Sequence, residues 1–232
     1  MSPLDKSLSR RQLIGLLGAA GAVAAARCGS SDTPTSPSSS STPTTSSNSA
    51  CVVTPTETLG PYPSLTDLVR SDIREGKTGT VLTLTIKVVN TNNACAAVPG
   101  VNVEIWHVDA AGNYSQYGTQ TAQTCLRGIQ TTNSAGEVTF TTIYPGWYQG
   151  RATHIHVEVT QNGASRKVTQ MAFPESVNNS VYGTGVYASR GSNPMSNLSD
   201  GIFADSLSSE LVTPTGSAAG GYAATFQVSI AV

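Results

Sequence analysis

The sequence predicts an all-β fold, an antiparallel β-sandwich with long irregular loops and little helix. Apolar and polar residues alternate in short runs, which lie at 81–89, 101–108, 137–143, 154–160 and 224–231. Segments rich in Gly, Pro and Asn separate the runs, at 98–100, 110–113, 134–136, 145–146 and 162–163. Short period-2 runs punctuated by such turns are typical of strands that bury one face in a sandwich.

The remaining segments carry weaker signals. We expect residues 64–75 to form a short helical turn. Residues 174–220 show weak periodicity and contain many Gly, Ser and Asn residues, so we expect a long irregular excursion with a short helix around 205–211.

Only part of the 232-residue chain is expected to enter the sandwich. Residues 1–28 place Arg10 and Arg11 before a run rich in Ala, Gly and Leu, which predicts a twin-arginine-type signal peptide and an exported protein, either secreted or associated with the cell envelope. Residues 29–50 are almost entirely Ser, Thr and Pro and predict a disordered linker. Residues 51–232 remain for one folded domain.

Charge and cysteine content restrict the partners and the covalent structure. The net charge is −1 and there is no basic cluster, so we expect no nucleic-acid partner, and membrane attachment only if Cys28 is lipidated. Beyond the linker, cysteines stand at positions 51, 95 and 125, an odd number. In an exported protein, one disulfide and one leftover thiol is the simplest arrangement.

The stretch RATHIHVEV at 151–159 holds two of the three histidines of the chain. In a strand, His154 and His156 share one face, and Ile155 and its apolar neighbours share the other. Two imidazoles spaced in this way can bind one metal ion, although they can also be two half-exposed polar residues. A zinc site completed by the third histidine, His107, is also open at this point.

Tyrosines in two loops offer a different set of ligands. Tyr114 and Tyr148 lie in loops that flank predicted strands. A loop tyrosine is usually a packed ring with its hydroxyl group in water. Metal ligation needs the phenolate, which costs about 4 kcal/mol at pH 7 because a free tyrosine has a pKa of about 10. A bound Fe³⁺ ion could offset this cost, since a hard trivalent cation favours anionic oxygen.

Several motifs occur in the order of the intradiol ring-cleavage dioxygenases, the catechol and protocatechuate dioxygenases that use non-haem iron(III). They are TETLGPYP at 56–63, IWHVDAAGNYS at 105–115, LRG at 126–128 and TIYPGWYQGRATHIHVEV at 142–159. The sequence most resembles the exported bacterial branch of this family, over most of residues 51–175. The resemblance implies an intradiol-type sandwich with an Fe³⁺ ion held by Tyr114, Tyr148, His154 and His156.

The resemblance also implies an activity and further residue roles. A catecholic substrate would be cleaved with O₂ to a cis,cis-muconate-type product, and Tyr148 would leave the iron when the substrate binds. Arg151 matches the family's arginine three residues before the first histidine and would stabilise carbanionic charge. Gln170 matches a glutamine that lines the family's active site. His107 falls where the family needs no histidine and receives a structural role.

The resemblance pairs Cys51 with Cys95 and leaves Cys125 as a buried free thiol. Two features differ from the well-known catechol enzymes. Only Gln149 and Gly150 separate Tyr148 from Arg151, where those enzymes have a longer connection. Leu59 stands where they have an acidic residue. The pocket wall must therefore differ, and neither the natural substrate nor the oligomeric state follows from the family.

Two other functions remain open from the sequence. One is a zinc hydrolase or lyase that uses His107, His154 and His156, which would be colourless where an iron–tyrosinate protein is red-brown. The other is a non-catalytic binding module, since β-sandwiches serve many functions. Oxygen uptake with simple catechols separates such a module from a dioxygenase.

Overall fold

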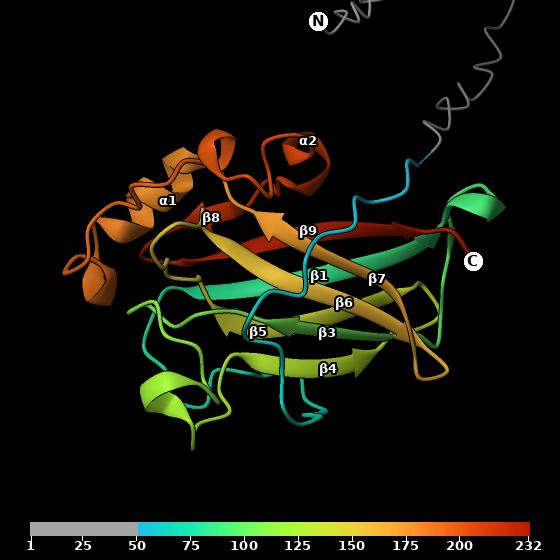
Figure 1. Cartoon of the computed structure of the whole chain (residues 1–232), viewed down its shortest axis with the longest axis horizontal. Coiled ribbons are helices and arrows are strands. Elements are labelled where there is room, and N and C mark those ends of the chain that lie inside the picture. Colours follow the sequence, from blue (N-terminus) through green and yellow to red (C-terminus); the bar gives the residue numbers. More distant parts are fainter. Residues whose placement is uncertain (1–50) are drawn as a thin grey trace, which may run out of the picture. The chain divides into compact units, whose positions relative to one another are not determined.

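The computed structural model describes residues 51–232, so the expected signal peptide at 1–28 and linker at 29–50 lie outside the described residues. The described chain forms two sheets (Figure 1). The first has the order β4-β3-β6-β7, and the second has the order β2-β1-β9-β8 with β5 paired to β1. The strands are β1 Val81–Asn90, β2 Ala96–Ala97, β3 Asn102–Trp106, β4 Arg127–Thr131, β5 Glu137–Ile143, β6 His154–Gln161, β7 Ala164–Ala172, β8 Thr215–Ser217 and β9 Gly221–Ile230.

All five alternating runs form strands, namely β1, β3, β5, β6 and β9, which confirms the all-β prediction. The structure adds β4 and β7, together with the short β2 and β8. Alternation fails in β4 because it begins with a buried arginine followed by glycine. It fails in β7 because this strand buries Lys167 and Thr169 as well as apolar residues. The pair β1–β9 is parallel, so the sandwich is not purely antiparallel.

The expected helical turn at 64–75 is wrong. This segment pairs with strands instead, through the backbone hydrogen bonds Arg70 N to Ile129 O (3.1 Å) and Ile73 N to Thr141 O (3.0 Å). Bonding to a sheet satisfies these backbone groups without a helix.

The excursion at 174–220 holds the expected short helix, α2 Leu207–Glu210. It also holds α1 Glu175–Tyr182, which the sequence did not reveal. Short 3₁₀ turns complete the described elements: η1 Thr91–Asn93, η2 Gly118–Gln120, η3 Gly185–Tyr187 and η4 Asn197–Ser199. Within 51–232, none of the helices has the length and apolar character that a membrane crossing needs.

An apolar core fills the space between the sheets. Alternate residues of the strands supply it, which is what the period-2 pattern predicts. Fully buried members include Leu82, Leu84 and Ile86 of β1 and Ile155, Val157 and Val159 of β6. Because side chains alternate across a strand, His154 and His156 of β6 lie on the outer face of the first sheet, away from this core.

The segment that begins at Cys51 is fastened across the strands. Cys51 and Cys95 form the expected disulfide, and among the described cysteines Cys125 is unpaired and buried. Thr54 N donates to Ser229 O of β9 (2.9 Å), and Glu57 N donates to Val168 O of β7 (2.9 Å). These bonds lead the chain from β9 across β7 toward the histidine strand (Figure 1).

Candidate metal centre

The site is built on the outer face of β6. The rings of His154 and His156 lie 4.9 Å apart between centroids. The strand register places Trp106 of β3 and Gln170 of β7 on either side of His156. The Trp106 indole stacks on the His156 imidazole, with 4.8 Å between centroids and 3° between planes. The predicted shared face of the two histidines is therefore confirmed, and β3 supplies a stacking partner.

Burial favours the neutral form of both imidazoles. His154 Nδ1 lies 2.6 Å from Ala152 O, so this nitrogen carries the proton and Nε2 keeps its lone pair. Burial lowers the pKa of His154 to about 3 and the pKa of His156 well below its ordinary value. The Nδ1 atom of His156 is buried and has no hydrogen-bond partner among residues 51–232. Neutral imidazoles with free lone pairs are the form that binds metals.

A tightly folded loop after β3 carries Tyr114. Asp109 Oδ1 accepts hydrogen bonds from the backbone N–H groups of Ala111 and Asn113, both at 3.0 Å. Gly112 sits in the turn with φ of 81°, and a Cβ atom there would lie 2.3 Å from Trp147 O. The loop therefore presses against the segment that carries Tyr148. It also brings the Tyr114 hydroxyl to 3.4 Å from His154 Nε2.

Tyr148 completes the cluster from the loop between β5 and β6. Its ring lies 5.7 Å from that of Tyr114 and 5.5 Å from that of His154, between centroids. Burial raises the pKa of Tyr148, while the nearby Arg151 opposes this effect. Burial raises the pKa of Tyr114 well above its ordinary value. Both side chains are therefore neutral phenols unless a strong positive charge is brought to their oxygens.

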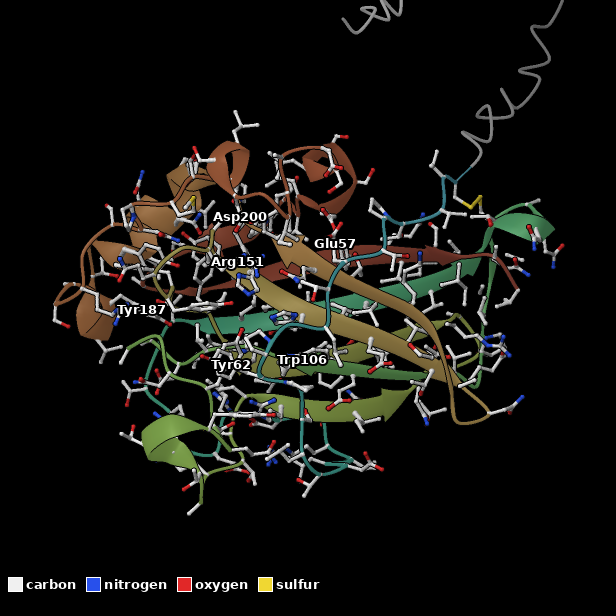
Figure 2. All side chains as sticks on the ribbon, viewed as in Figure 1. Glu57, Tyr62, Trp106, Arg151, Tyr187 and Asp200 are labelled. Atoms are coloured by element: carbon white, nitrogen blue, oxygen red, sulfur yellow. A yellow bond between two sulfur atoms is a disulfide. The ribbon has the colours of Figure 1, made fainter. Side chains whose placement is uncertain are left out.

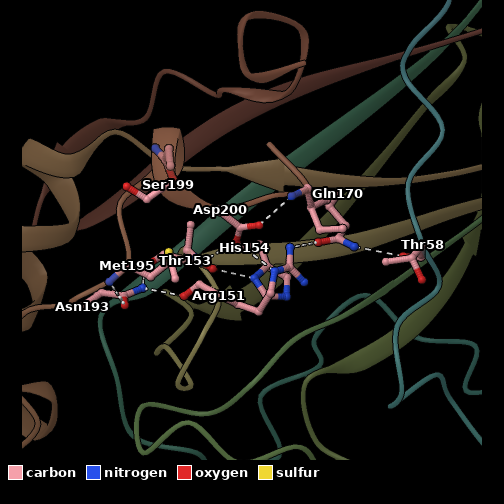
Figure 3. A network of polar contacts seen from close by, with 12 residues as sticks. Thr58, Arg151, Thr153, His154, Gln170, Asn193, Met195, Ser199 and Asp200 are labelled. Carbon is pink, nitrogen blue, oxygen red and sulfur yellow. Dashed lines mark hydrogen bonds and ion pairs between the residues drawn. The ribbon is translucent and has the colours of Figure 1, made fainter. Parts of the chain in front are cut away.

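Arg151 is held at the site by a polar network (Figure 3). Its Nε donates to Asp200 Oδ2 at 2.8 Å, and its Nη2 donates to Gln170 Oε1 at 2.6 Å. Gln170 Nε2 in turn donates to Thr58 O at 2.9 Å. Asp200 Oδ2 also accepts from Ala152 N at 2.6 Å. The structure thus brings together Arg151 and Gln170, and Asp200 fixes the backbone of Ala152, two residues before β6.

Asp200 was not found from the sequence. It is almost completely buried, comes from the long excursion, and lies 49 residues after Arg151. Figure 2 shows Asp200 and Arg151 close to each other, in agreement with their hydrogen bond. Nothing in the local sequence NLSDGIF distinguishes this aspartate from a surface residue. Only its position in the folded chain reveals its role.

His107 does not belong to the cluster. Its Nδ1 lies 2.8 Å from Val108 O, and its Nε2 lies 2.7 Å from Thr142 Oγ1. The side chain is fully buried, and burial lowers its pKa to about 4. Within 51–232 there is no group of three His, Cys, Asp or Glu side chains arranged for a metal ion. The predicted packing role is confirmed, and the three-histidine zinc arrangement does not form.

A small cavity of about 150 Å³ adjoins the two tyrosines. Its lining is aromatic and polar and consists of Tyr62, Gly112, Asn113, Tyr114, Tyr117, Gly118, Thr119 and Tyr148. The Tyr62 ring lies 4.8 Å from that of Tyr114 and 5.2 Å from that of Tyr117, between centroids. Tyr62 lies in the motif TETLGPYP, but its contact with the site emerges only from the fold.

The donor set fits a hard trivalent cation. Two phenol oxygens and two neutral imidazoles lie within one cluster of aromatic rings. His156 keeps a buried ring nitrogen that no hydrogen bond within the described part of the chain uses. Two phenolates in so enclosed a place need a strongly charged partner, and Fe³⁺ satisfies this requirement better than a softer divalent ion.

Comparison with known proteins is consistent with this geometry. A dioxygenase family model matches residues 59–179, just over half of the chain. An intradiol ring-cleavage dioxygenase from Tetranychus urticae is 30% identical with a TM-score of 0.70, and the match covers 78% of this chain and 95% of that one. The dioxygenase domain of a dioxygenase carbohydrate-binding protein fusion from Streptomyces sp. SirexAA-E is 26% identical, with 78% and 99% covered and a TM-score of 0.59.

A more distant structure shares the fold. The 3-chlorocatechol 1,2-dioxygenase from Rhodococcus opacus 1CP is 20% identical, with a TM-score of 0.55. The match covers 77% of this chain and 72% of that one. At this identity the likeness concerns the sandwich and not the details of the pocket.

Proposed function

We propose that this chain, which belongs to the intradiol ring-cleaving dioxygenase family, is an Fe³⁺-dependent enzyme. It would open the ring of a small catechol with O₂. The product would be a cis,cis-muconate-type diacid. The proposed ligands of the iron are Tyr114, Tyr148, His154 and His156. The observation that carries the proposal is their convergence from two loops and one strand, with Tyr114 Oη 3.4 Å from His154 Nε2.

The two tyrosines differ in a way that suggests different roles. Tyr114 is only 5% exposed and is fixed by a loop that Asp109 braces. Tyr148 is half-buried and follows the Pro145-Gly146 pair in its loop. Burial raises its pKa, and the nearby Arg151 lowers it. We assign Tyr148 as the ligand that would give way to substrate and would then hold a proton at its phenol oxygen. Tyr114 would stay in place.

An Fe³⁺ ion at this site would act as a Lewis acid and template for a catecholate. Arg151 places a fixed positive charge near that position, because Asp200 and Gln170 hold its guanidinium. A charge that is already in place stabilises developing negative charge on a substrate ring without reorganisation. Arg151 and Gln170 are therefore the proposed catalytic partners of Tyr148.

The cavity beside the two tyrosines guides the choice of substrate class. It is small, about 150 Å³, and its aromatic walls suit a single ring better than a larger ring system. The tyrosine hydroxyl groups and Asn113 suit polar substituents on that ring. We propose a one-ring catechol as the substrate class and expect fused or biaryl catechols to be turned over poorly.

Oxygen uptake and product analysis test the function. The purified, iron-loaded protein is mixed with catechol, and O₂ consumption is compared with the ultraviolet absorbance of the diene-diacid product. We expect equal amounts of O₂ consumed and product formed, and loss of both with Tyr148→Phe. No uptake with any one-ring catechol in a protein that carries one iron per chain would leave a binding module as the better account.

We further propose that the chain is exported by its N-terminal segment. Support comes from the adjacent Arg10 and Arg11 before an apolar run. Replacing both arginines by lysine should leave the protein in the cytoplasm of a bacterial host, whereas the native sequence should yield protein outside it. Equal distribution of the two forms would remove the proposal, and mass spectrometry of exported protein would show whether Cys28 is retained.

A further inference from the structure

Arg127, the first residue of β4, is fully buried beside the metal centre. The register places it opposite Trp106 of β3, which itself lies opposite His156, so all three side chains belong to the outer face of the first sheet. A charged side chain is almost never completely enclosed unless something compensates for its charge. We therefore expect other groups near Arg127 to compensate for its charge.

The hydrogen bonds of Arg127 go to neutral oxygen atoms. Nε donates to Ser115 O (3.2 Å) and Ser115 Oγ (3.0 Å), and Nη2 donates to Ser115 O (2.7 Å). Nη1 donates to Tyr62 O (3.0 Å) and to Ser64 Oγ (3.4 Å). These bonds tie the segment at 62–64 to the residue that follows Tyr114. They orient the guanidinium, but none of them brings a negative charge.

No carboxylate lies within ion-pair distance of Arg127 in the described part of the chain. Glu104 attracts it from farther away, and burial raises the pKa of Glu104 itself. The guanidinium remains charged because arginine does not lose its proton in proteins. Arg127 is therefore a buried cation with an incomplete set of counter-charges.

The groups that face this cation are tyrosine rings. The guanidinium carbon lies 5.7 Å from the ring centroid of Tyr114 and 5.4 Å from that of Tyr117. A cation over an aromatic ring is attracted to it, and the attraction is greater when both are desolvated. It is greater still when the ring carries negative charge, as it does in a tyrosinate bound to a metal. Tyr114 is thus the one proposed ligand that faces both the metal position and Arg127.

We propose that Arg127 is a positioning residue for the metal centre, whose buried charge is the electrostatic partner of the Tyr114 ligand. The inference rests on the proposed iron function. Arg127 acts through Tyr114 and not on substrate, because it is fully enclosed behind that ring. Arg151 differs, since its guanidinium is partly exposed and bonded to Asp200. Arg151 lowers the pKa of both tyrosines, against the larger effect of burial, whereas the guanidinium of Arg127 lies over the ring of Tyr114.

Two substitutions distinguish the effect of the charge at position 127 from the effect of its hydrogen bonds. Arg127→Gln removes the charge, and Arg127→Lys keeps it but loses the planar fork. Arg70→Gln is the matched control, because Arg70 also bonds to β4, through Arg127 O (2.9 Å), but has its own carboxylate partner in Glu75. Each full-length variant is loaded with Fe³⁺, and its iron affinity, thermal stability and visible tyrosinate-to-iron charge-transfer band are measured.

We expect Arg127→Gln to bind Fe³⁺ about tenfold or more weakly, a change of about 1.4 kcal/mol. Its band should move to longer wavelength, because a tyrosinate without its cation gives up an electron more easily. Arg127→Lys should keep the wild-type band and an affinity within about threefold, since it retains the charge. Arg70→Gln should keep both. All three variants should lose thermal stability, so stability alone does not decide the question.

The alternatives give different results. Wild-type affinity and band in folded Arg127→Gln would overturn the inference, as would a lysine variant that loses both. If the glutamine variant does not fold, the lysine variant decides, with a retained band supporting the inference and a shifted band contradicting it. A wild-type protein that takes up no iron or shows no band would instead refute the proposed function, which distinguishes the two failures.

Discussion

The two faces of β6 are both buried, but against different kinds of side chain. The inner face packs Ile155, Val157 and Val159 among apolar side chains, and no polar group there needs a partner. The outer face is nearly as well buried at His154 and His156, yet it is aromatic and polar. Within residues 51–232, the Nδ1 atom of His156 has no hydrogen-bond partner, and Arg127 of β4, on the same face of the sheet, has no ion-pair partner.

This difference separates stability from function along a single strand. The inner layer is complete as it stands, because each apolar group gains free energy by leaving water. In the proposed function, a cation completes the outer layer by joining two phenols and two imidazoles. Substitutions in the inner layer should therefore reduce the free energy of unfolding, and substitutions in the outer layer should reduce metal binding while the fold persists.

The largest loss of stability is expected from Phe140→Ala in β5. This ring is fully buried between the sheets, and its removal leaves a cavity. We expect the free energy of unfolding to fall by about 3–5 kcal/mol. Chemical denaturation measures this loss. The fraction that remains folded should keep the visible band, and a stable but colourless variant would show that the two faces are not separable.

The largest loss of function is expected from Tyr114→Phe. It keeps the ring and removes the oxygen that lies 3.4 Å from His154 Nε2. Iron affinity, the visible band and ring cleavage should fall, the last by about a hundredfold or more, equivalent to about 2.7 kcal/mol. Thermal unfolding should change little.

His107→Gln is the matched control, because His107 precedes Tyr114 by seven residues and belongs to the other face. Its two ring nitrogens bond to Val108 O and Thr142 Oγ1. The substitution should cost about 1–2 kcal/mol of stability and keep the colour. Release of metal by His107→Gln, with metal retained by Tyr114→Phe, would revive the three-histidine site.

The sequence predicts the inner and outer faces of β6 to different extents, because the two faces carry different kinds of pattern. The inner face repeats every second residue, so β1, β3, β5, β6 and β9 could be recognised locally. β7 was not recognised because a buried lysine, Lys167, interrupts the alternation of apolar and polar residues in this strand. The Lys167 ammonium group donates to Thr54 O instead of reaching water. The parallel pairing of β1 with β9 depends on residues more than a hundred positions apart and has no local signal.

The site was predicted from motifs, not from periodicity. The spacing of His154 and His156 gave their shared face. Tyr114 and Tyr148 were possible ligands from their loop positions, and only the family resemblance assigned them as expected ligands. The structure brings all four together, although their role as ligands remains a proposal. Asp200 and Tyr62 could not be found, because each reaches the site through the folding of a distant segment.

A smaller effect on the outer face is expected from Gly60→Ala. Gly60 has φ of 74°, and a Cβ atom there would lie 3.0 Å from His156 Cε1. The imidazole must shift, so we expect about tenfold weaker iron binding, since coordination geometry is sensitive to such displacement. Gly76→Ala is the control, because Gly76 has a similar φ of 77° but open space around it. Equal effects in the two variants would indicate backbone strain alone.

The smallest effect concerns pH. Burial and the neighbouring Glu210 and Asp205 raise the pKa of Glu57 to about 7 from an ordinary value near 4.5. The folded protein then holds the Glu57 proton more tightly than the unfolded chain does, so its stability falls as pH rises from about 4.5 to 7. Glu57→Gln removes this dependence, and its Tm should rise relative to wild type between pH 5 and pH 8.

The control for this pH dependence is Asp72→Asn. A hydrogen bond from Arg74 lowers the pKa of Asp72 to about 2, so its contribution is lost only in acid. The Tm difference between Asp72→Asn and wild type should therefore stay constant from pH 5 to pH 8. A Glu57→Gln difference that is equally constant would contradict the assigned environment of Glu57.

Metal analysis of the purified wild-type protein, combined with its visible spectrum before and after addition of catechol, tests the central claim most directly. We expect one iron per chain and a broad visible band, because the proposed ligands include two tyrosinates that would donate charge to the metal. We also expect the band to shift with catechol, because in the proposed function the substrate would replace Tyr148. One equivalent of zinc with no visible band, or an iron band that ignores catechol, would contradict it.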